Sequence, residues 1–170
     1  DFLSSSEDFH DPMILLNMQG AVERVLFAID HHEPIAVYGD YDVDGVSATA
    51  LLTETIQLLG GGVTAYIPNR FEEGYGLNIE ALSHLREQGI RLVVTVDCGI
   101  RSLREAEYAR QIGLDLIISD HHHPLKEIPP ANFVICPKQK GDEYPEKNLA
   151  GVGVAYKIAR ALLKLGQKNL

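Results

Sequence analysis

Tyr38-Gly39-Asp40-Tyr41-Asp42-Val43-Asp44-Gly45 is the stretch around which the chain is organised, and it ends a short apolar run at residues 35–38. Three carboxylates stand at alternate positions in it, with a glycine on either side. In an extended segment all three would point to the same side, because side chains alternate along a strand. Such crowding is costly unless a positive charge separates the carboxylates, and hard divalent cations prefer several oxygen ligands. Taken alone, the motif fits a metal site or a solvated acidic turn equally well.

Outward from this stretch, apolar β-rich runs alternate with helical patterns along the chain. Strands are predicted at 35–38, 63–67, 92–96, 114–119 and 133–136, and helices at 17–32, 46–59, 79–87, 103–112 and 152–165. The strands are apolar on both faces, which is typical of buried parallel sheets. We therefore expect an α/β fold: a doubly wound, mainly parallel five-stranded sheet with helices on both faces. Residues 1–16 are expected to form an N-terminal arm, and residues 17–170 the domain itself.

Composition places the chain among globular proteins and says little about partners. The 170 residues are 45% hydrophobic and 23% charged, and no apolar run approaches the roughly 20 residues of a membrane span. A net charge of −9 argues against a dedicated polyanion-binding surface, although bound metal ions would reverse the sign locally. Only Cys98 and Cys136 are present, without a C-x-x-C pair, so we expect no disulfide framework and a cytoplasmic location.

Polar side chains fall where three of the predicted strands end. Asp40, Asp42 and Asp44 follow the first strand, Asp97 follows residues 92–96, and Asp120-His121-His122 follows residues 114–119. Ligands of parallel sheets bind beyond the carboxyl ends of the strands, so these groups are expected to converge. Carboxylates and imidazoles without thiolates suit Mn²⁺ or Mg²⁺ better than structural zinc, and there are enough of them for two ions. Because two-metal sites promote in-line displacement at phosphorus, the sequence predicts hydrolysis of a phosphoester or phosphoanhydride.

Several of these segments resemble a known family. Residues 39–45 (GDYDVDG), 96–99 (VDCG) and 120–122 (DHH) resemble the first three motifs of the DHH phosphoesterase superfamily. Within it, residues 70–77 (RFEEGYGL) and 149–155 (LAGVGVA) resemble the RecJ family of single-strand-specific 5′→3′ DNA exonucleases. The resemblance implies a Mn²⁺- or Mg²⁺-dependent exonuclease on single-stranded DNA in recombination and repair, with single-strand-binding protein and a helicase as partners and no role at a membrane. A phosphodiesterase on short oligonucleotides or cyclic dinucleotides, an inorganic pyrophosphatase and a non-catalytic DHH scaffold remain alternatives.

The resemblance also implies which residues bind the metal pair. The matched positions are Asp42, Asp44, Asp97 and His121, with Asp97 as the bridge between the two ions. Asp40 matches a further carboxylate of the first motif and is included among the expected ligands.

Other matched residues imply roles beside the metals. His122 matches a residue near the scissile phosphate, where an imidazolium would stabilise developing negative charge. Asp120 is expected to orient the histidines, and Arg70 matches a phosphate-binding arginine. Tyr38 stands where several relatives carry a histidine, so any ligand role of that position is lost here.

The C-terminal third leaves two questions open. Gly151 and Gly153 open the last predicted helix, where exposed N–H groups could hold a phosphate or the glycines could serve close packing. The family carries a fourth motif with another ligand aspartate, and a second domain that clamps nucleic acid, both expected beyond Leu170. We do not expect Asp142 to replace that aspartate. Residues 1–170 alone are therefore expected to bind metal weakly and to show little or no activity.

Overall fold

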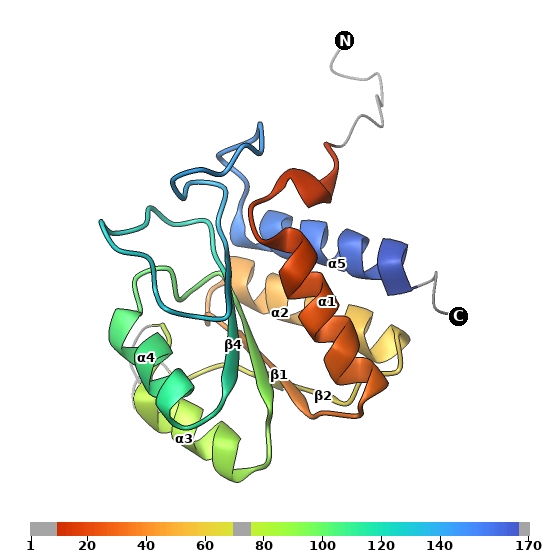
Figure 1. Ribbon diagram of the computed structural model, residues 1–170, viewed down its shortest axis with the longest axis vertical. Coiled ribbons are helices and arrows are strands. Elements are labelled where there is room, and N and C mark those ends of the chain that lie inside the picture. The colour runs from red at the N-terminus through yellow and green to blue at the C-terminus, as the bar shows by residue number, and fades with distance from the viewer. Residues whose placement is uncertain (1–9, 70–75, 167–170) are drawn as a thin grey trace.

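Five parallel strands form the central sheet of the computed structural model, which describes residues 10–69 and 76–166 (Figure 1). The strands are β1 Ile35–Gly39, β2 Val63–Tyr66, β3 Leu92–Val96, β4 Asp115–Ser119 and β5 Phe133–Ile135, in the order β2-β1-β3-β4-β5. The helices are α1 Met18–Asp30, α2 Val43–Leu58, α3 Ile79–Glu87, α4 Leu103–Gln111 and α5 Gly151–Gly166. The predicted doubly wound, five-stranded parallel sheet is thus confirmed. Across the two described ranges, no helix combines the length and the apolar character that crossing a membrane requires.

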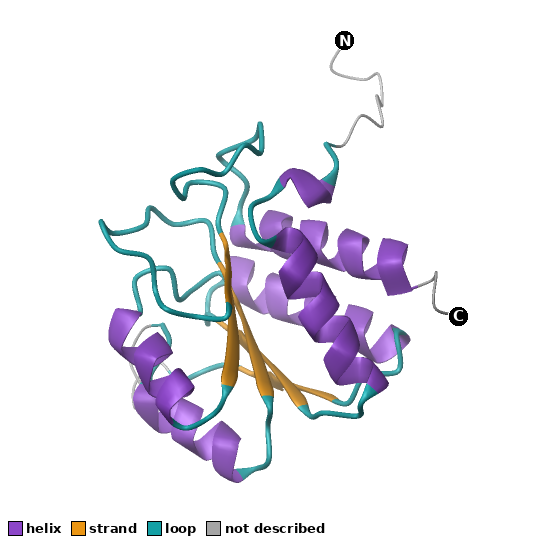
Figure 2. Cartoon of the chain, viewed as in Figure 1, coloured by secondary structure: helices purple, strands orange, loops and turns teal. Residues whose placement is uncertain are grey.

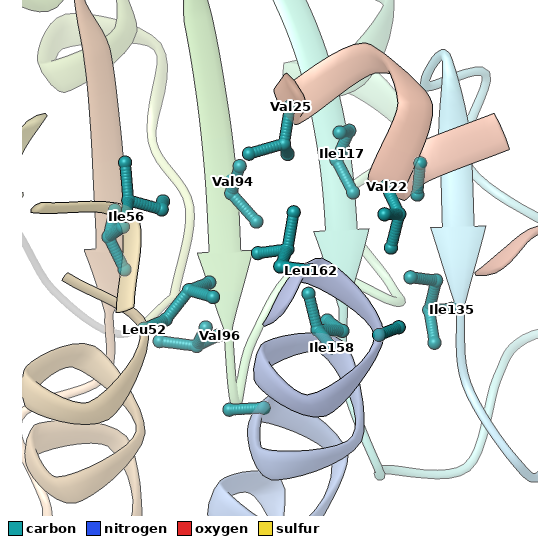
Figure 3. Packing of buried hydrophobic residues seen from close by; sticks show 14 of the residues in the cluster. Val22, Val25, Leu52, Ile56, Val94, Val96, Ile117, Ile135, Ile158 and Leu162 are labelled. Carbon is teal, nitrogen blue, oxygen red and sulfur yellow. The ribbon is translucent and has the colours of Figure 1, made fainter. Parts of the chain in front are cut away.

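Helices cover both faces of the sheet and bury a separate core on each. Helices α1, α2 and α5 pack on one face and α3 and α4 on the other (Figures 1 and 2). Burial of apolar surface from water is the main force that holds these layers together. Figure 3 shows side chains of the helices, such as Val22, Leu52 and Leu162, packed against side chains of the sheet, such as Val94 and Ile117.

The register of the strands explains why distant aspartates converge. Gly39 is paired with Val96, and Val96 with Ser119, so the last residues of β1, β3 and β4 stand in one row across the sheet. The residue that follows each of them is an aspartate. The chain leaves β1 for β2 on one side and reaches β3 on the other, and such a switch point is where open α/β sheets bind their ligands.

Helix α2 begins three residues earlier than predicted, so the extended conformation considered for residues 40–44 is wrong. Asp42 is the N-cap residue, and its Oδ1 accepts a hydrogen bond from the N–H of Gly45 (2.9 Å). Asp44 therefore lies in the first helical turn, where a carboxylate is stabilised by the helix dipole. A Cβ on Gly45 would lie 2.5 Å from the carbonyl oxygen of Asp40, which explains the glycine.

The described part of the predicted arm packs on this domain. Pro12–Ile14 forms a short 3₁₀ helix, and the side chain of Leu15 is buried in the core with α1 and α5. Lys157 Nζ contacts the carbonyl oxygen of His10 at 3.4 Å.

Tyr38 connects the end of β1 to the start of α3. Its fully buried side chain donates a hydrogen bond to the carbonyl oxygen of Gly76 (2.9 Å) and accepts one from Asn78 Nδ2 (3.2 Å). We expect Tyr38→Phe to lower the free energy of unfolding by about 1–3 kcal/mol, because both partners lose a bond inside the protein. Urea denaturation would measure the change, and an unchanged midpoint would contradict this structural role.

Candidate metal centre

The predicted ligands come together at the carboxyl edge of the sheet. Two groups of three side chains each offer ligand atoms within 4.8 Å of one another, and Asp97 belongs to both. One group adds His121 and His122 to it, and the other adds Asp40 and Asp42. Asp44 lies beside the first group, with its Oδ2 at 3.7 Å from His121 Nε2. Asp97 is therefore the one residue common to both groups of possible ligand atoms among the described residues.

Nε2 of His121 and Oδ1 of Asp97 face each other at 3.0 Å. His121 Nδ1 lies 3.0 Å from the carbonyl oxygen of Leu149, which can only accept, so Nδ1 carries the ring proton. In the neutral ring, Nε2 then presents its lone pair to Asp97 Oδ1 at 3.0 Å. That oxygen is buried and accepts no hydrogen bond from the described residues. Two acceptors at this distance require a positive group between them, either a proton or a metal ion.

The surroundings of Asp97 oppose its ionisation. Its side chain is only 2% exposed, and burial followed by the charges of Asp44 and Asp42 raises the pKa of Asp97 to about 7. Its backbone has a positive φ of 61°, which aspartate and asparagine tolerate better than most residues. A bound cation would remove the cost of this carboxylate, so the donor set fits a divalent metal.

The metal-free protein is expected to become more stable as the pH falls from about 8 to about 5. A group whose pKa is raised on folding binds its proton more tightly in the folded state, and its stabilising contribution is lost as the pH rises through the folded value, here about 7 for Asp97. Because one pKa unit corresponds to about 1.4 kcal/mol, the change should exceed about 1 kcal/mol. Chemical denaturation in EDTA at several pH values would measure it.

Asp97→Asn is the control for this pH dependence. The variant cannot titrate at that position, so its stability curve should be flatter than that of the wild type. Part of the slope should remain, because the pKa of His122 is also raised. Equal slopes in the two proteins would contradict the assignment to Asp97.

Both carboxylate oxygens of Asp120 accept hydrogen bonds, two of them from His122. Its Oδ1 accepts from His122 Nδ1 (2.7 Å) and from the N–H groups of His121 and His122, and its Oδ2 accepts from the N–H of Ile100 (2.9 Å). Burial works to raise the pKa of Asp120, but the bonds from His122 and Ile100 outweigh it and the pKa is lowered. The same bond raises the pKa of His122 above its usual 6.5, against an opposing effect of burial. These bonds place Asp120 to orient the ring of His122.

Asp40 and Asp42 complete the second group of ligand atoms. Asp40 is buried, its Oδ1 accepts from the N–H of Tyr41 (2.8 Å), and burial raises its pKa. Asp42 is exposed, and its Oδ1 caps α2.

The first turn of α5 provides contacts that the sequence did not predict. The N–H groups of Gly151 and Val152 each donate to a carboxylate oxygen of Asp44, both at 2.7 Å. These two donors are therefore engaged within the protein, and the anion they hold is a side chain rather than a phosphate. No side-chain pattern could have revealed this, because the donors belong to the backbone.

Two further residues named from the sequence are not part of the described cluster: Asp142, which was not expected to be a ligand, and Arg70, which was expected to contact phosphate. Asp142 accepts hydrogen bonds from the N–H groups of Leu16 and Tyr144 and pairs with Lys147 Nζ at 2.8 Å, in line with the expectation that it is not a substitute ligand. Arg70, the predicted phosphate contact, lies outside the described residues.

A pocket of about 340 Å³ adjoins the cluster on the side of His122. Its described lining includes His122, Asp120, Ile100, Arg101 and Ser102. Arg101 lines the same pocket as His122, and its Nε donates to the carbonyl oxygen of His123 (3.0 Å). Arg101 belongs to none of the motifs in the sequence, so only its place in the pocket draws attention to it.

The chain is similar to known proteins in both sequence and fold. The single-stranded-DNA-specific exonuclease RecJ of Bacillus subtilis is 49% identical over 156 residues, which are 92% of this chain and 20% of that protein. The chain thus spans about a fifth of that relative's length. A crystal structure of exonuclease RecJ bound to manganese matches with a TM-score of 0.81 and 35% identity, over 89% of this chain and 38% of the other. RecJ of Thermus thermophilus in complex with Mn²⁺ matches with a TM-score of 0.74 and 32% identity, over 89% and 22%.

The part of the chain that matches a family model also contains the candidate metal ligands. Residues 34–170, from the start of β1 through α5, match the N-terminal domain of the DHH family. That span contains all the carboxylates and histidines described above, together with the backbone groups that hold them. The chain belongs to the DHH family.

Proposed function

We propose that this chain carries the metal-binding part of a Mn²⁺- or Mg²⁺-dependent exonuclease that hydrolyses single-stranded DNA. The observation that carries the proposal is the pair of facing acceptors, Asp97 Oδ1 and His121 Nε2, inside a cluster of carboxylates. The likeness to RecJ proteins, named as single-stranded-DNA-specific exonucleases and crystallised with manganese, supports the choice of metal and substrate.

The donor atoms present would hold two ions that share Asp97. His121 and Asp44 would serve one of them, and Asp40 and Asp42 the other. When bound, two such ions supply Lewis acidity to the attacking and leaving oxygens of a phosphodiester. The oxygen-rich donor set without thiolates favours Mn²⁺ or Mg²⁺ over a structural zinc ion.

The role of His122 follows from its bond to Asp120. Because Nδ1 donates to Asp120 and the pKa of His122 is raised, the ring carries a positive charge over more of the neutral pH range than a free histidine. Its Nε2–H would then donate to a phosphate oxygen as negative charge develops. Arg101, on the same pocket, would add a second positive charge for the phosphate.

A degradation assay tests the proposed function. The protein, expressed with any sequence that naturally adjoins residues 1–170, would receive labelled single-stranded DNA, duplex DNA, dinucleotides or pyrophosphate in Mn²⁺. We expect degradation of long single strands that EDTA abolishes, in keeping with a DNA-processing enzyme of the cytoplasm. Preference for dinucleotides or pyrophosphate would replace the proposed substrate, and folded protein that hydrolyses none of them would leave a scaffold role. Binding of single-strand-binding protein or a helicase can be tested with the same preparation.

A further inference from the structure

We propose that the backbone of residues 149–152, at the start of α5, is the positioning element of the metal centre. It fixes the ring of His121, holds the carboxylate of Asp44 and leaves space for Asp97 only because residue 151 is glycine. The inference rests on the proposed function, since it concerns the same site. It assigns a role to a segment whose sequence fitted either phosphate binding or close packing.

The first contact sets the tautomer of His121. The carbonyl oxygen of Leu149 lies 3.0 Å from Nδ1, and a carbonyl can only accept a hydrogen bond. The ring proton is therefore held on Nδ1, and Nε2 is left with its lone pair toward Asp97 and Asp44. A hydrogen bond of this kind also fixes the plane of the ring and raises the basicity of the ligating nitrogen.

The second contact holds Asp44 near two other carboxylates. Both of its oxygens accept backbone hydrogen bonds of 2.7 Å, Oδ2 from Gly151 and Oδ1 from Val152. These N–H groups belong to the first turn of α5, where they have no partner within the helix and the helix dipole favours negative charge. Asp44 itself lies in the first turn of α2, so two helix N-termini offset the repulsion from Asp97 and Asp42.

The third contact is a close approach that no side chain would permit. A Cβ at residue 151 would clash with Asp97 Oδ1 and would lie 2.6 Å from Cβ and Cγ of the same side chain. Asp97 has little freedom to move away, because it directly follows β3 and is buried. An alanine at 151 would therefore displace either the carboxylate of Asp97 or the first turn of α5 that holds Asp44.

Gly153 provides a matched control two residues further along. A Cβ there would lie 3.4 Å from Leu149 Cβ and Cδ2, which is an ordinary contact. Alanine is a better helix former than glycine, so Gly153→Ala should keep or raise the thermal stability of the protein. The two variants add the same methyl group to the same helical turn and differ in what that group meets.

The test compares Mn²⁺ binding by Gly151→Ala, Gly153→Ala and the wild type, using titration calorimetry on the protein with its naturally adjoining sequence. We expect about 10- to 100-fold weaker binding for Gly151→Ala, the usual cost of losing groups that orient metal ligands, and unchanged binding for Gly153→Ala. The activity of Gly151→Ala should recover at raised Mn²⁺, which a misfolded protein would not show. Equal Mn²⁺ affinity in Gly151→Ala and the wild type would overturn the inference while leaving the proposed function intact.

A metal-free measurement separates this inference from the proposed function. In EDTA, Asp44→Asn should increase the hydrogen-exchange rates of the Gly151 and Val152 amides, because an asparagine side chain cannot accept both bonds. Exchange of the Gly166 amide, at the far end of α5, should stay the same. If the wild type binds no Mn²⁺, the proposed function fails, and the exchange data still decide whether α5 holds Asp44. Unchanged exchange at both amides would overturn the positioning role.

Discussion

Asp97→Asn is expected to abolish Mn²⁺-dependent hydrolysis, lowering kcat by at least about 10³-fold through the loss of several kcal/mol of transition-state stabilisation. The substitution removes the one carboxylate that belongs to both groups of ligand atoms. Asparagine is preferred to alanine because residue 97 has a φ of 61°, a conformation that asparagine adopts readily. The effect therefore reports on the lost charge rather than on a strained backbone.

The same variant should separate metal binding from folding. In EDTA, Asp97→Asn should be at least as stable as the wild type at about pH 8, because a buried carboxylate with a pKa of about 7 no longer has to ionise. Addition of Mn²⁺ should raise the Tm of the wild type and leave that of the variant unchanged.

Asp115→Asn is the matched control. Asp115 begins β4 at the opposite edge of the sheet, where it pairs with Arg24 at 2.7 Å. Its replacement removes the same charge without touching the cluster, so hydrolysis and the Mn²⁺-induced shift should persist. An Asp97→Asn variant that still shows that shift would contradict the shared-ligand role.

His121→Gln and His122→Gln are expected to impair different properties of the protein, the first its affinity for Mn²⁺ and the second its kcat. His122→Gln should lower kcat by about 10²- to 10³-fold, the typical cost of removing a donor that stabilises transition-state charge, with a smaller change in Mn²⁺ affinity. His121→Gln should mainly weaken Mn²⁺ binding, because Nε2 of that ring faces Asp97 and Asp44. The distinction rests on Asp120, which engages Nδ1 of His122 and raises its pKa.

Paired measurements decide between the two roles. Mn²⁺ affinity from calorimetry and kcat at saturating Mn²⁺ would be compared for both variants. His122→Gln should also lose the acidic dependence of kcat that an imidazolium donor produces, in which activity falls as the pH rises above the pKa of His122. Loss of Mn²⁺ affinity in His122→Gln as severe as in His121→Gln would instead place His122 among the metal ligands.

The sequence predicted the sheet well because its signals are local. Residues 92–96 are apolar or β-branched throughout and form β3 with the predicted bounds, and residues 79–87 form α3 as predicted. The strand order could not be read from the sequence, since it depends on which faces of the helices find partners. The sequence places the start of α2 too late, because Asp42 and Asp44 follow β1 so closely that their roles as helix cap and first-turn residue carry no separate signal.

The side chains of the candidate site could be predicted from the sequence, but the backbone groups that bind to them could not. Asp97 and His121 could be located because each follows a buried strand, and the parallel register brings them together. The carbonyl group of Leu149 and the N–H groups of Gly151 and Val152 carry no side-chain signal. Their position became visible only in the packed structure, where α5 lies against α2 (Figure 1).

The placement of α5 has a consequence for synthesis on the ribosome. Proteins are made from the N-terminus, so the strands and their acidic ends leave the ribosome before residues 149–152 do. Until α5 docks, Asp44 lacks its two backbone donors and the ring of His121 lacks the carbonyl that orients it. The nascent chain therefore carries the cluster as mutually repelling, unoriented carboxylates. The contacts that hold the centre therefore cannot form before α5, the last described helix, has been synthesised.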